Sequence, residues 1–488
     1  MSKPMFHPDR RTFLRRSAAL SIMGAAAPWA MNLAALADAS AATVDSSSDS
    51  TDYKALVCVF LVGGNDHANT LVPYDLDSHQ AYAAARTNLA TARADLAATV
   101  LSTRGLPEGR QMALAPSLAL LKPLFEAQRL GVLLNIGPLV KPITVADFRQ
   151  GRNLPPRLFS HNDQQAVWQS YAPEGGTTGW GGLIGDVWGP GPSAGAFTCV
   201  NTSGQAVFLS GNVVQPYALV PGGPLPLHAV KDGLFGDGSG SSTLRSAVLE
   251  ELIGQDLHPL PLAREHAKVM VRALAAQSAL SDALAGTPDF GDLFIESENV
   301  VKGGVSQLVS RPLARQLRTV ARMIAAGPSQ GLRRQVFFVS LGGFDLHDGL
   351  LAQHAGLLQQ VAQALSGFDQ AVQQMGMDRQ VTTFTASDFG RTLSSNGDGS
   401  DHGWGGHHLV MGGAVAGGQF FGQLPPPGLE GDEHHVGQGR LLPTMAVDQL
   451  AASLARWMGV GESDLGAIAP HHGEFDASVL AGLFRSEP

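Results

Sequence analysis

Charge and cysteine are both scarce in this sequence. Asp, Glu, Lys and Arg make up 15% of the 488 residues, against about 25% in an ordinary soluble domain. The two cysteines form no metal-binding or haem motif, and no Gly-x-Gly-x-x-Gly loop occurs. These absences argue against a redox enzyme that carries a dinucleotide, haem or iron–sulfur cofactor. Outside the first sixteen residues Lys and Arg do not cluster, and the net charge is −9, so no nucleic-acid partner is expected.

Hydrophobic residues and glycine, in contrast, are plentiful. The hydrophobic fraction is 44%, the mean hydropathy is +0.04 and 58 residues are glycine. This composition excludes an intrinsically disordered chain, which combines low hydrophobicity with high net charge. No Gly-X-Y period is present, so a collagen helix is excluded as well. The length suits one large α/β domain or two ordinary ones.

The N-terminus has the pattern of a cleavable export signal. Asp9–Arg15 contains two adjacent arginines, an alanine-rich apolar run follows over Ala18–Ala37, and Ala39–Ala41 offers small residues for cleavage. The arginine pair resembles the twin-arginine (Tat) type of signal. We therefore predict a signal peptide over 1–41, the Tat translocase as export partner, and a periplasmic or extracellular bacterial location. A polar linker is expected over 42–52.

A basic amphipathic helix or a membrane anchor is the alternative for the same segment. Pro28 and Asn32 interrupt the apolar run, which makes it marginal as a bilayer span. No other segment approaches the roughly 18 consecutive apolar residues that suggest a span. We therefore expect no membrane span in the mature chain.

The remaining chain alternates between apolar runs typical of buried strands and segments with helical periodicity. Strands are predicted at Ala55–Val62, Gly131–Gly137, Gln335–Leu341 and Gln380–Ala386, and helices at 113–128, 244–284, 299–327, 350–376 and 446–458. Such alternation predicts an α/β fold with a doubly wound, mostly parallel sheet and helices on both faces. We expect a single domain over 53–488, with a loop or hairpin insertion at about 177–240. Because Cys58 lies within the first strand, an unpaired thiol is favoured over a disulfide with Cys199.

Chemistry-bearing side chains follow the predicted strands. In open α/β sheets the active crevice lies outside the carboxyl ends of the strands, so these residues are expected to lie close together. Carboxylates and imidazoles that converge in a low-dielectric crevice indicate a divalent cation. Zn²⁺, Mn²⁺, Mg²⁺ and Ca²⁺ all remain possible from the ligand types. The predicted metal ligands are Asp66, Asp345, His347, Asp388 and His402.

Most of these carboxylates have a structural alternative. Asp66 is also placed to cap a helix, and Asp388 to cap one or to pair with Arg391. Ser160 opens a capping-box pattern in which Asp163 replaces the usual Glu. A helix start is also where a nucleophile would face an anionic group, so the two roles of Ser160 are compatible.

The other histidines differ in what they predict. His407 and His408 are adjacent and cannot both face one ion from a regular element, so one of them is expected to be structural. For His354 a core position and a ligand position are equally open. The pairs at 434–435 and 471–472 lie in polar stretches and are expected at the surface.

Taken together, these motifs resemble the DUF1501 family of exported bacterial proteins. The resemblance extends from about residue 53 to about residue 460. It is carried by the arginine pair, Gly63-Gly64-Asn65-Asp66, Ser160-His161 with Asp163-Gln164, Gly343–His347, Ser387–Thr392, Asp401–His408, Met411–Val415 and Gly439–Thr444. The family is similar in fold to the alkaline phosphatase and sulfatase superfamily. The resemblance implies that Ser160 is the nucleophile and that the five predicted ligands hold metal.

Two departures from the superfamily pattern limit what the resemblance implies. An Asp-His dipeptide is replaced by Asp388-Phe389, and the spacing of Asp345 and His347 is tighter than the usual Asp-x-x-x-His. A second metal is therefore not predicted. The leading hypothesis is an exported metal-dependent hydrolase of phosphate or sulfate esters with a small ester as substrate. In it, Arg391 or the helix start at Ser160 stabilises developing charge. The alternative is a non-catalytic periplasmic or envelope binding protein that keeps the fold.

Overall fold

The computed structural model describes residues 52–188, 197–204, 206–221, 223, 261–302, 305–429 and 433–486. The predicted signal peptide and most of the polar linker lie outside the described residues. So do parts of the predicted insertion and the first part of the helix predicted at 244–284. Among the described helices, none combines the length and hydropathy needed to cross a membrane.

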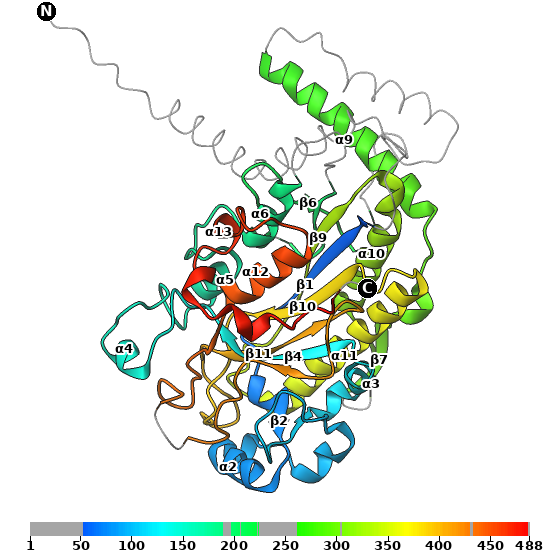
Figure 1. Cartoon of the computed structure of the whole chain (residues 1–488). Coiled ribbons are helices and arrows are strands. Elements are labelled where there is room, and N and C mark those ends of the chain that lie inside the picture. Colours follow the sequence, from blue (N-terminus) through cyan, green and yellow to red (C-terminus); the bar gives the residue numbers. More distant parts are fainter. Residues whose placement is uncertain are drawn as a thin grey trace, which may run out of the picture.

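One mixed sheet of nine strands organises the described part of the chain (Figure 1). Its order is β12-β4-β11-β10-β1-β9-β5-β6, and β13 also pairs with β4. β11 is antiparallel to β10 and to β4, whereas the other pairs in this sheet are parallel. The mostly parallel sheet predicted from the sequence is thereby confirmed. The strands are β1 (Lys54–Val62), β4 (Leu130–Gly137), β5 (Cys199–Asn201), β6 (Tyr217–Ala218), β9 (Arg334–Gly342), β10 (Val381–Ser387), β11 (Gly406–Met411), β12 (Phe420–Phe421) and β13 (Met445–Ala446).

Helices cover both faces of this sheet, as expected for a doubly wound fold. They are α2 (Leu76–Arg86), α3 (Lys122–Glu126), α4 (Val145–Arg149), α5 (His161–Ser170), α6 (Trp180–Val187), α9 (Pro261–Ala285), α10 (Pro312–Ala326), α11 (Leu350–Gln374), α12 (Val447–Trp457) and α13 (Leu465–Ile468). Figure 1 shows α5, α6 and α12 on one side and α10 and α11 on the other.

The central strand β1 supplies side chains to the cores on both faces. Val57 and Val59 belong to the hydrophobic core that includes α10 and α11. Cys58 and Phe60 belong to the core that includes α6 and α12. Successive side chains of a strand point to opposite faces, and a strand covered on both faces is apolar throughout, which explains the continuous run in the sequence. Cys58 and Cys199 are buried free thiols, in agreement with the favoured expectation.

Three segments differ from the sequence predictions. Residues 297–310 are not the start of a helix but a hairpin of β7 (Ser297–Lys302) and β8 (Val305–Ser310), and α10 begins only at Pro312. The stretch predicted as a helix at 113–128 contains the end of β3 (Met112–Leu114), which pairs with β2 (Leu71–Pro73), a 3₁₀ segment and the short α3. Within 177–240, β5 and β6 join the edge of the main sheet as parallel strands rather than forming a hairpin.

The carboxyl ends of β1, β9 and β10 lie level at one edge of the sheet. Val62 is the register partner of Gly342, and Leu61 is that of Ser387. Because the three strands end together, the loops that follow them are brought side by side. All of the predicted site residues except Ser160, which directly precedes α5, belong to these loops.

Candidate metal centre

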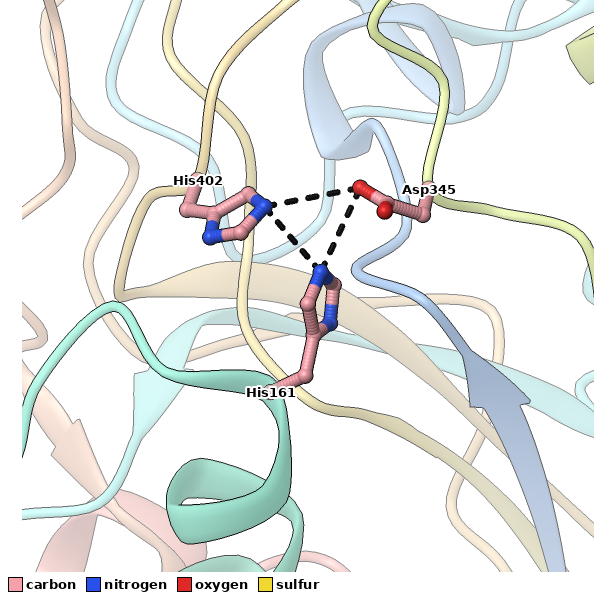
Figure 2. A group of neighbouring side chains, drawn as sticks. All are labelled: His161, Asp345 and His402. Atoms are coloured by element: carbon pink, nitrogen blue, oxygen red, sulfur yellow. Dashed lines mark hydrogen bonds and ion pairs between the residues drawn. The ribbon is translucent and has the colours of Figure 1, made fainter.

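His161, Asp345 and His402 place one ligand atom each within 4.8 Å of the others and form a group that could hold a metal ion. Asp345 follows β9, His402 lies in the segment between β10 and β11, and His161 is the first residue of α5. Figure 2 shows the three side chains pointing toward one another. The Nε2 atoms of His161 and His402 are 3.0 Å apart. Asp345 Oδ1 is 3.3 Å from the first and 3.5 Å from the second.

His347 lies beside this group as a fourth candidate ligand. Its Nε2 is 3.0 Å from His402 Nε2 and 3.1 Å from Asp345 Oδ1. Its Nδ1 is 3.4 Å from Asp401 Oδ1. Three of the five predicted metal ligands, Asp345, His347 and His402, are therefore brought together by the fold.

The hydrogen bonds of the two ring Nδ1 atoms determine what their Nε2 atoms can do. His402 Nδ1 faces the carbonyl oxygen of Phe159 at 2.8 Å, and His161 Nδ1 faces Asp388 Oδ2 at 2.7 Å. Both partners are acceptors, so each Nδ1 carries the proton of the neutral ring. The two Nε2 lone pairs then face each other at 3.0 Å. Such an arrangement is repulsive unless a proton or a metal cation lies between the rings.

The pKa values of these two rings are shifted in opposite directions. The hydrogen bond to Asp388 raises the pKa of His161. Burial lowers the pKa of His402. When the His161 ring is protonated, its Nε2 donates to the Nε2 of His402. A cation that binds both rings has to displace this proton.

The spacing and the donor types fit a first-row transition metal. Ligand atoms about 2.0–2.1 Å from a tetrahedral ion lie about 3.3 Å apart, and the distances above range from 3.0 to 3.5 Å. Imidazole nitrogens combined with a single carboxylate suit Zn²⁺ and its neighbours, whereas Mg²⁺ and Ca²⁺ prefer oxygen ligands. Of the four predicted ions, this donor set favours Zn²⁺.

Asp388, predicted as a metal ligand, lies behind His161 instead. One of its oxygens accepts hydrogen bonds from His161 Nδ1 at 2.7 Å and from Gln165 Nε2 at 2.8 Å. The other accepts from the backbone N–H of Gly63 at 3.0 Å. The side chain is fully buried, so it orients the imidazole as carboxylates behind metal-bound histidines do. In this structure Asp388 therefore lies outside the group of ligand atoms and is placed to orient His161.

Arg391, predicted to stabilise charge on a substrate, is fully buried and uses its N–H groups within the protein. Its acceptors are the carbonyl oxygens of Gly63, Gly64, Phe344 and Ser400 and the carboxylate of Asp345. The guanidinium therefore ties together the loops after β1, β9 and β10. Burial alone would raise the pKa of Asp345, but the bond to Arg391 holds that pKa below its ordinary value. In this structure Arg391 is thus placed to position these loops and Asp345.

Asp66 lies outside this group of ligands. It is buried in an ion pair with Arg86. Desolvation would raise its pKa, but Arg86 holds the pKa below the ordinary value. His354 is also buried, its Nε2 is 2.9 Å from Asn65 Oδ1, and burial lowers its pKa to about 4. A guanidinium, rather than a shared ion, therefore compensates the charge of Asp66.

Ser160, the predicted nucleophile, is the N-cap residue of α5 but its side chain makes no capping hydrogen bond. Its hydroxyl instead donates to Asp163 Oδ2 at 2.9 Å. The residue stands between Phe159, whose carbonyl holds His402, and His161. The capping box suggested by the sequence is therefore not formed.

An aromatic ring closes one side of the centre. Phe389 is buried, and its centroid lies 4.8 Å from that of His161 and 4.7 Å from that of His402. It directly follows Asp388 in the sequence. His161 itself was not among the predicted ligands, and its position directly after Ser160 was the available signal.

Comparisons with known proteins give a partial family match and two distant structural likenesses. The chain matches no curated protein. It is similar to the crystal structure of Ps i-CgsB in complex with k-i-k-neocarrahexaose (10% identity, TM-score 0.34), covering 84% of this chain and 74% of that one. It is also similar to the lipoteichoic acid synthase LtaP from Listeria monocytogenes (10% identity, TM-score 0.33), covering 88% of this chain and 78% of that one. Neither likeness is strong enough to assign chemistry.

Residues 285–461 match the family model described as "Protein of unknown function (DUF1501)". The matched segment contains Asp345, His347, Asp388 and His402, whereas Ser160 and His161 lie before it. The match is confined to this segment, which is less than half of the chain.

Proposed function

We propose that the chain is a metal-dependent hydrolase of small phosphate or sulfate esters. The observation that carries the proposal is the convergence of His161, Asp345 and His402 at the carboxyl edge of the sheet. When the rings of His161 and His402 are both neutral, their unprotonated Nε2 atoms face each other. A cation or a proton on His161 relieves the repulsion between these nitrogens, and the carboxylate of Asp345 beside both rings supports the cation.

His161, His402 and Asp345 are each held from behind by a different group. Asp388 orients His161, the Phe159 carbonyl orients His402, and Arg391 binds Asp345. When bound, a divalent cation would supply Lewis-acid polarisation of an ester oxygen and a lowered pKa for a nucleophile. The N-terminus of α5, which begins at His161, adds a positive electrostatic contribution that favours an anionic ester.

Ser160 is the residue of this chain best placed to act as nucleophile. Its proton is directed to Asp163, which leaves the lone pairs of the hydroxyl oxygen available. Burial would raise the pKa of Asp163, but the hydrogen bonds from Ser160 and from the Glu174 backbone N–H hold that pKa below its ordinary value. We therefore assign Asp163 the role of fixing the hydroxyl rather than that of a strong base.

The proposal is tested by turnover with defined metals. The purified chain, stripped of metal and reloaded with Zn²⁺, Mn²⁺ or Co²⁺, is assayed on chromogenic phosphate and sulfate monoesters. We expect hydrolysis that depends on the metal and that is lost in His402→Ala. The exposed His434→Ala is the matched control and should retain activity. Absence of turnover with every metal and both ester classes would overturn the hydrolase proposal.

A non-catalytic binding protein is the second candidate, and a specific observation favours it. The hydroxyl of Ser160 and the guanidinium of Arg391 are both engaged with groups of the protein. In that case the centre would bind a metal or an oxyanion without turnover, and Ser160→Ala would bind both as the parent does. A hydrolase that uses Ser160 predicts loss of turnover in the same variant with metal binding retained.

We also propose export through the Tat route to the periplasm or the cell exterior. The support is the arginine pair Arg10-Arg11 with the apolar run that follows it. Replacing both arginines by lysine should leave the full-length chain in the cytoplasm, and unchanged export would contradict the proposal.

A further inference from the structure

The candidate histidine ligands of the metal centre differ in how strongly burial and hydrogen bonds fix their side chains. His161 and His402 have one-quarter-exposed side chains, with 26% and 25% of their area accessible, whereas 45% of His347 is accessible. The Nδ1 atoms of the first two make hydrogen bonds of 2.7 and 2.8 Å. The corresponding contact of His347, to Asp401, is 3.4 Å long. His347 is therefore the ligand with the weakest support.

Asp401, which lies beside His347, is partly exposed and shares its carboxylate with another donor. Asp401 Oδ1 accepts a hydrogen bond from Asn396 Nδ2 at 2.8 Å, and 36% of the Asp401 side chain is exposed. A carboxylate that is solvated and shared in this way orients an imidazole less strictly than the fully buried Asp388 does. The tautomer and the ring position of His347 are therefore less constrained than those of His161.

The backbone of His347, in contrast, is tightly packed. A side chain at Gly399 would come within 2.2 Å of the His347 carbonyl carbon and oxygen. The neighbouring N–H of Ser400 donates to Leu346 O at 3.1 Å. Rotation of the His347 side chain, rather than movement of the loop, is therefore the motion that this packing permits.

We propose that His347 is an exchangeable fourth ligand, which gives up its place to a small oxyanion while His161, Asp345 and His402 remain bound. This inference rests on the metal centre of the proposed function. Four protein ligands make a closed, structural type of site, whereas catalytic sites keep one position open. An exchangeable His347 gives the same centre a closed resting form and an open form for the substrate class proposed above.

The test uses the full chain loaded with Co²⁺, whose visible absorption depends on coordination number and ligand set. Inorganic phosphate and sulfate are titrated into the parent, His347→Ala and His347→Gln, with His434→Ala as control. If His347 occupies its position nine-tenths of the time, its removal should tighten phosphate binding about tenfold. The variants should still bind one Co²⁺ per chain with an altered spectrum. His402→Ala should weaken Co²⁺ binding far more than His347→Ala does.

Three results would overturn the inference. A spectrum and an oxyanion affinity unchanged in His347→Ala would show that His347 is not a ligand. A loss of Co²⁺ as severe as in His402→Ala would show that His347 is an obligatory ligand. A parent chain that binds no Co²⁺ would remove this inference and the metal centre together. Co²⁺ binding without ester hydrolysis would overturn the hydrolase alone, and the phosphate titration would then support or reject the exchange independently.

Discussion

At the scale of single residues, Asp388 and His161 determine how well the centre binds a metal. Asp388→Asn keeps the size of the side chain but leaves only one acceptor oxygen. It therefore cannot accept hydrogen bonds from both His161 Nδ1 and the Gly63 N–H, as the two carboxylate oxygens do. We expect metal affinity to fall by about 10–100-fold, the range for groups that orient ligands. Isothermal titration of the stripped protein with Zn²⁺ measures this change.

The control for this substitution is Asp292→Asn, which changes an exposed carboxylate far along the chain. It should leave the affinity unchanged. If Asp388→Asn bound Zn²⁺ as the parent does, Asp388 would have no part in orienting His161. If binding were abolished in the folded variant, a direct ligand role would be favoured.

The raised pKa of His161 predicts how metal binding depends on pH. The hydrogen bond to Asp388 favours the protonated ring, and a ring that binds metal through Nε2 has to lose that proton. Affinity should therefore fall as the pH decreases through the raised pKa, beginning above the ordinary value of about 6.5. Zn²⁺ titrations across this range, with proton release measured in two buffers, check the prediction. Affinity independent of pH would contradict it.

At the scale of elements, the loops after β1 and β9 approach so closely that only glycine fits at residue 63. Gly63 has a φ of +116°, and a Cβ there would lie 2.4 Å from the backbone nitrogen of Asp345. Gly63→Ala should displace Asp345, lower metal affinity and destabilise the fold by more than about 1 kcal/mol. Thermal unfolding and Zn²⁺ titration measure the two effects.

Gly109 provides the matched comparison, because it has a φ of +76° and open space around its Cβ position. Gly109→Ala should show the cost of the backbone conformation without the contact, and no change in metal affinity. Equal effects of both substitutions on Zn²⁺ binding would contradict the steric argument.

Local apolar patterns explain which strands and helices could be predicted from the sequence. β1, β4 and β9 were found because strands covered on both faces are rich in apolar residues, and β10 because its Val, Thr and Phe residues favour strands. α11 and α12 were found because their apolar residues recur with helical spacing. The hairpin at 297–310 was assigned to a helix because its apolar residues do not alternate strictly with polar ones. The parallel edge pairing of β5 depends on contacts with β9, which no local pattern encodes.

At the scale of the whole molecule, the sheet topology accounts for what could be predicted of the site. Strand ends brought Asp345, His347 and His402 together, as a parallel sheet requires. His161 was missed because it begins a helix that the order of strands does not place. Asp66 and Asp388 also follow strands, but Arg86 and His161 fill the space beside them. Partners so distant in sequence are set by packing rather than by spacing.

Global stability should also respond to one buried carboxylate outside the metal centre. Asp448, in the first turn of α12, is fully buried. Its Oδ1 accepts from the backbone N–H of His471 at 2.8 Å and lies 3.3 Å from that ring's Nδ1. Its Oδ2 has no hydrogen-bond partner within the described structure. Burial raises the pKa of Asp448 to about 6, although His471 acts in the opposite direction.

A folded-state pKa above the unfolded value means that folding favours the protonated form of Asp448. Its stabilising contribution is complete below about pH 4, the ordinary value for Asp, and is lost as the pH rises through about 6. Asp448→Asn, which stays neutral, should therefore raise the free energy of unfolding at about pH 7.5 by up to roughly 3 kcal/mol, and by much less near pH 4. Chemical denaturation of parent and variant at several pH values gives the difference in their free energies of unfolding. The titration of all other groups contributes equally to both proteins and cancels in this difference. A variant that is less stable than the parent at about pH 7.5 would show instead that the ionised carboxylate stabilises the fold through His471.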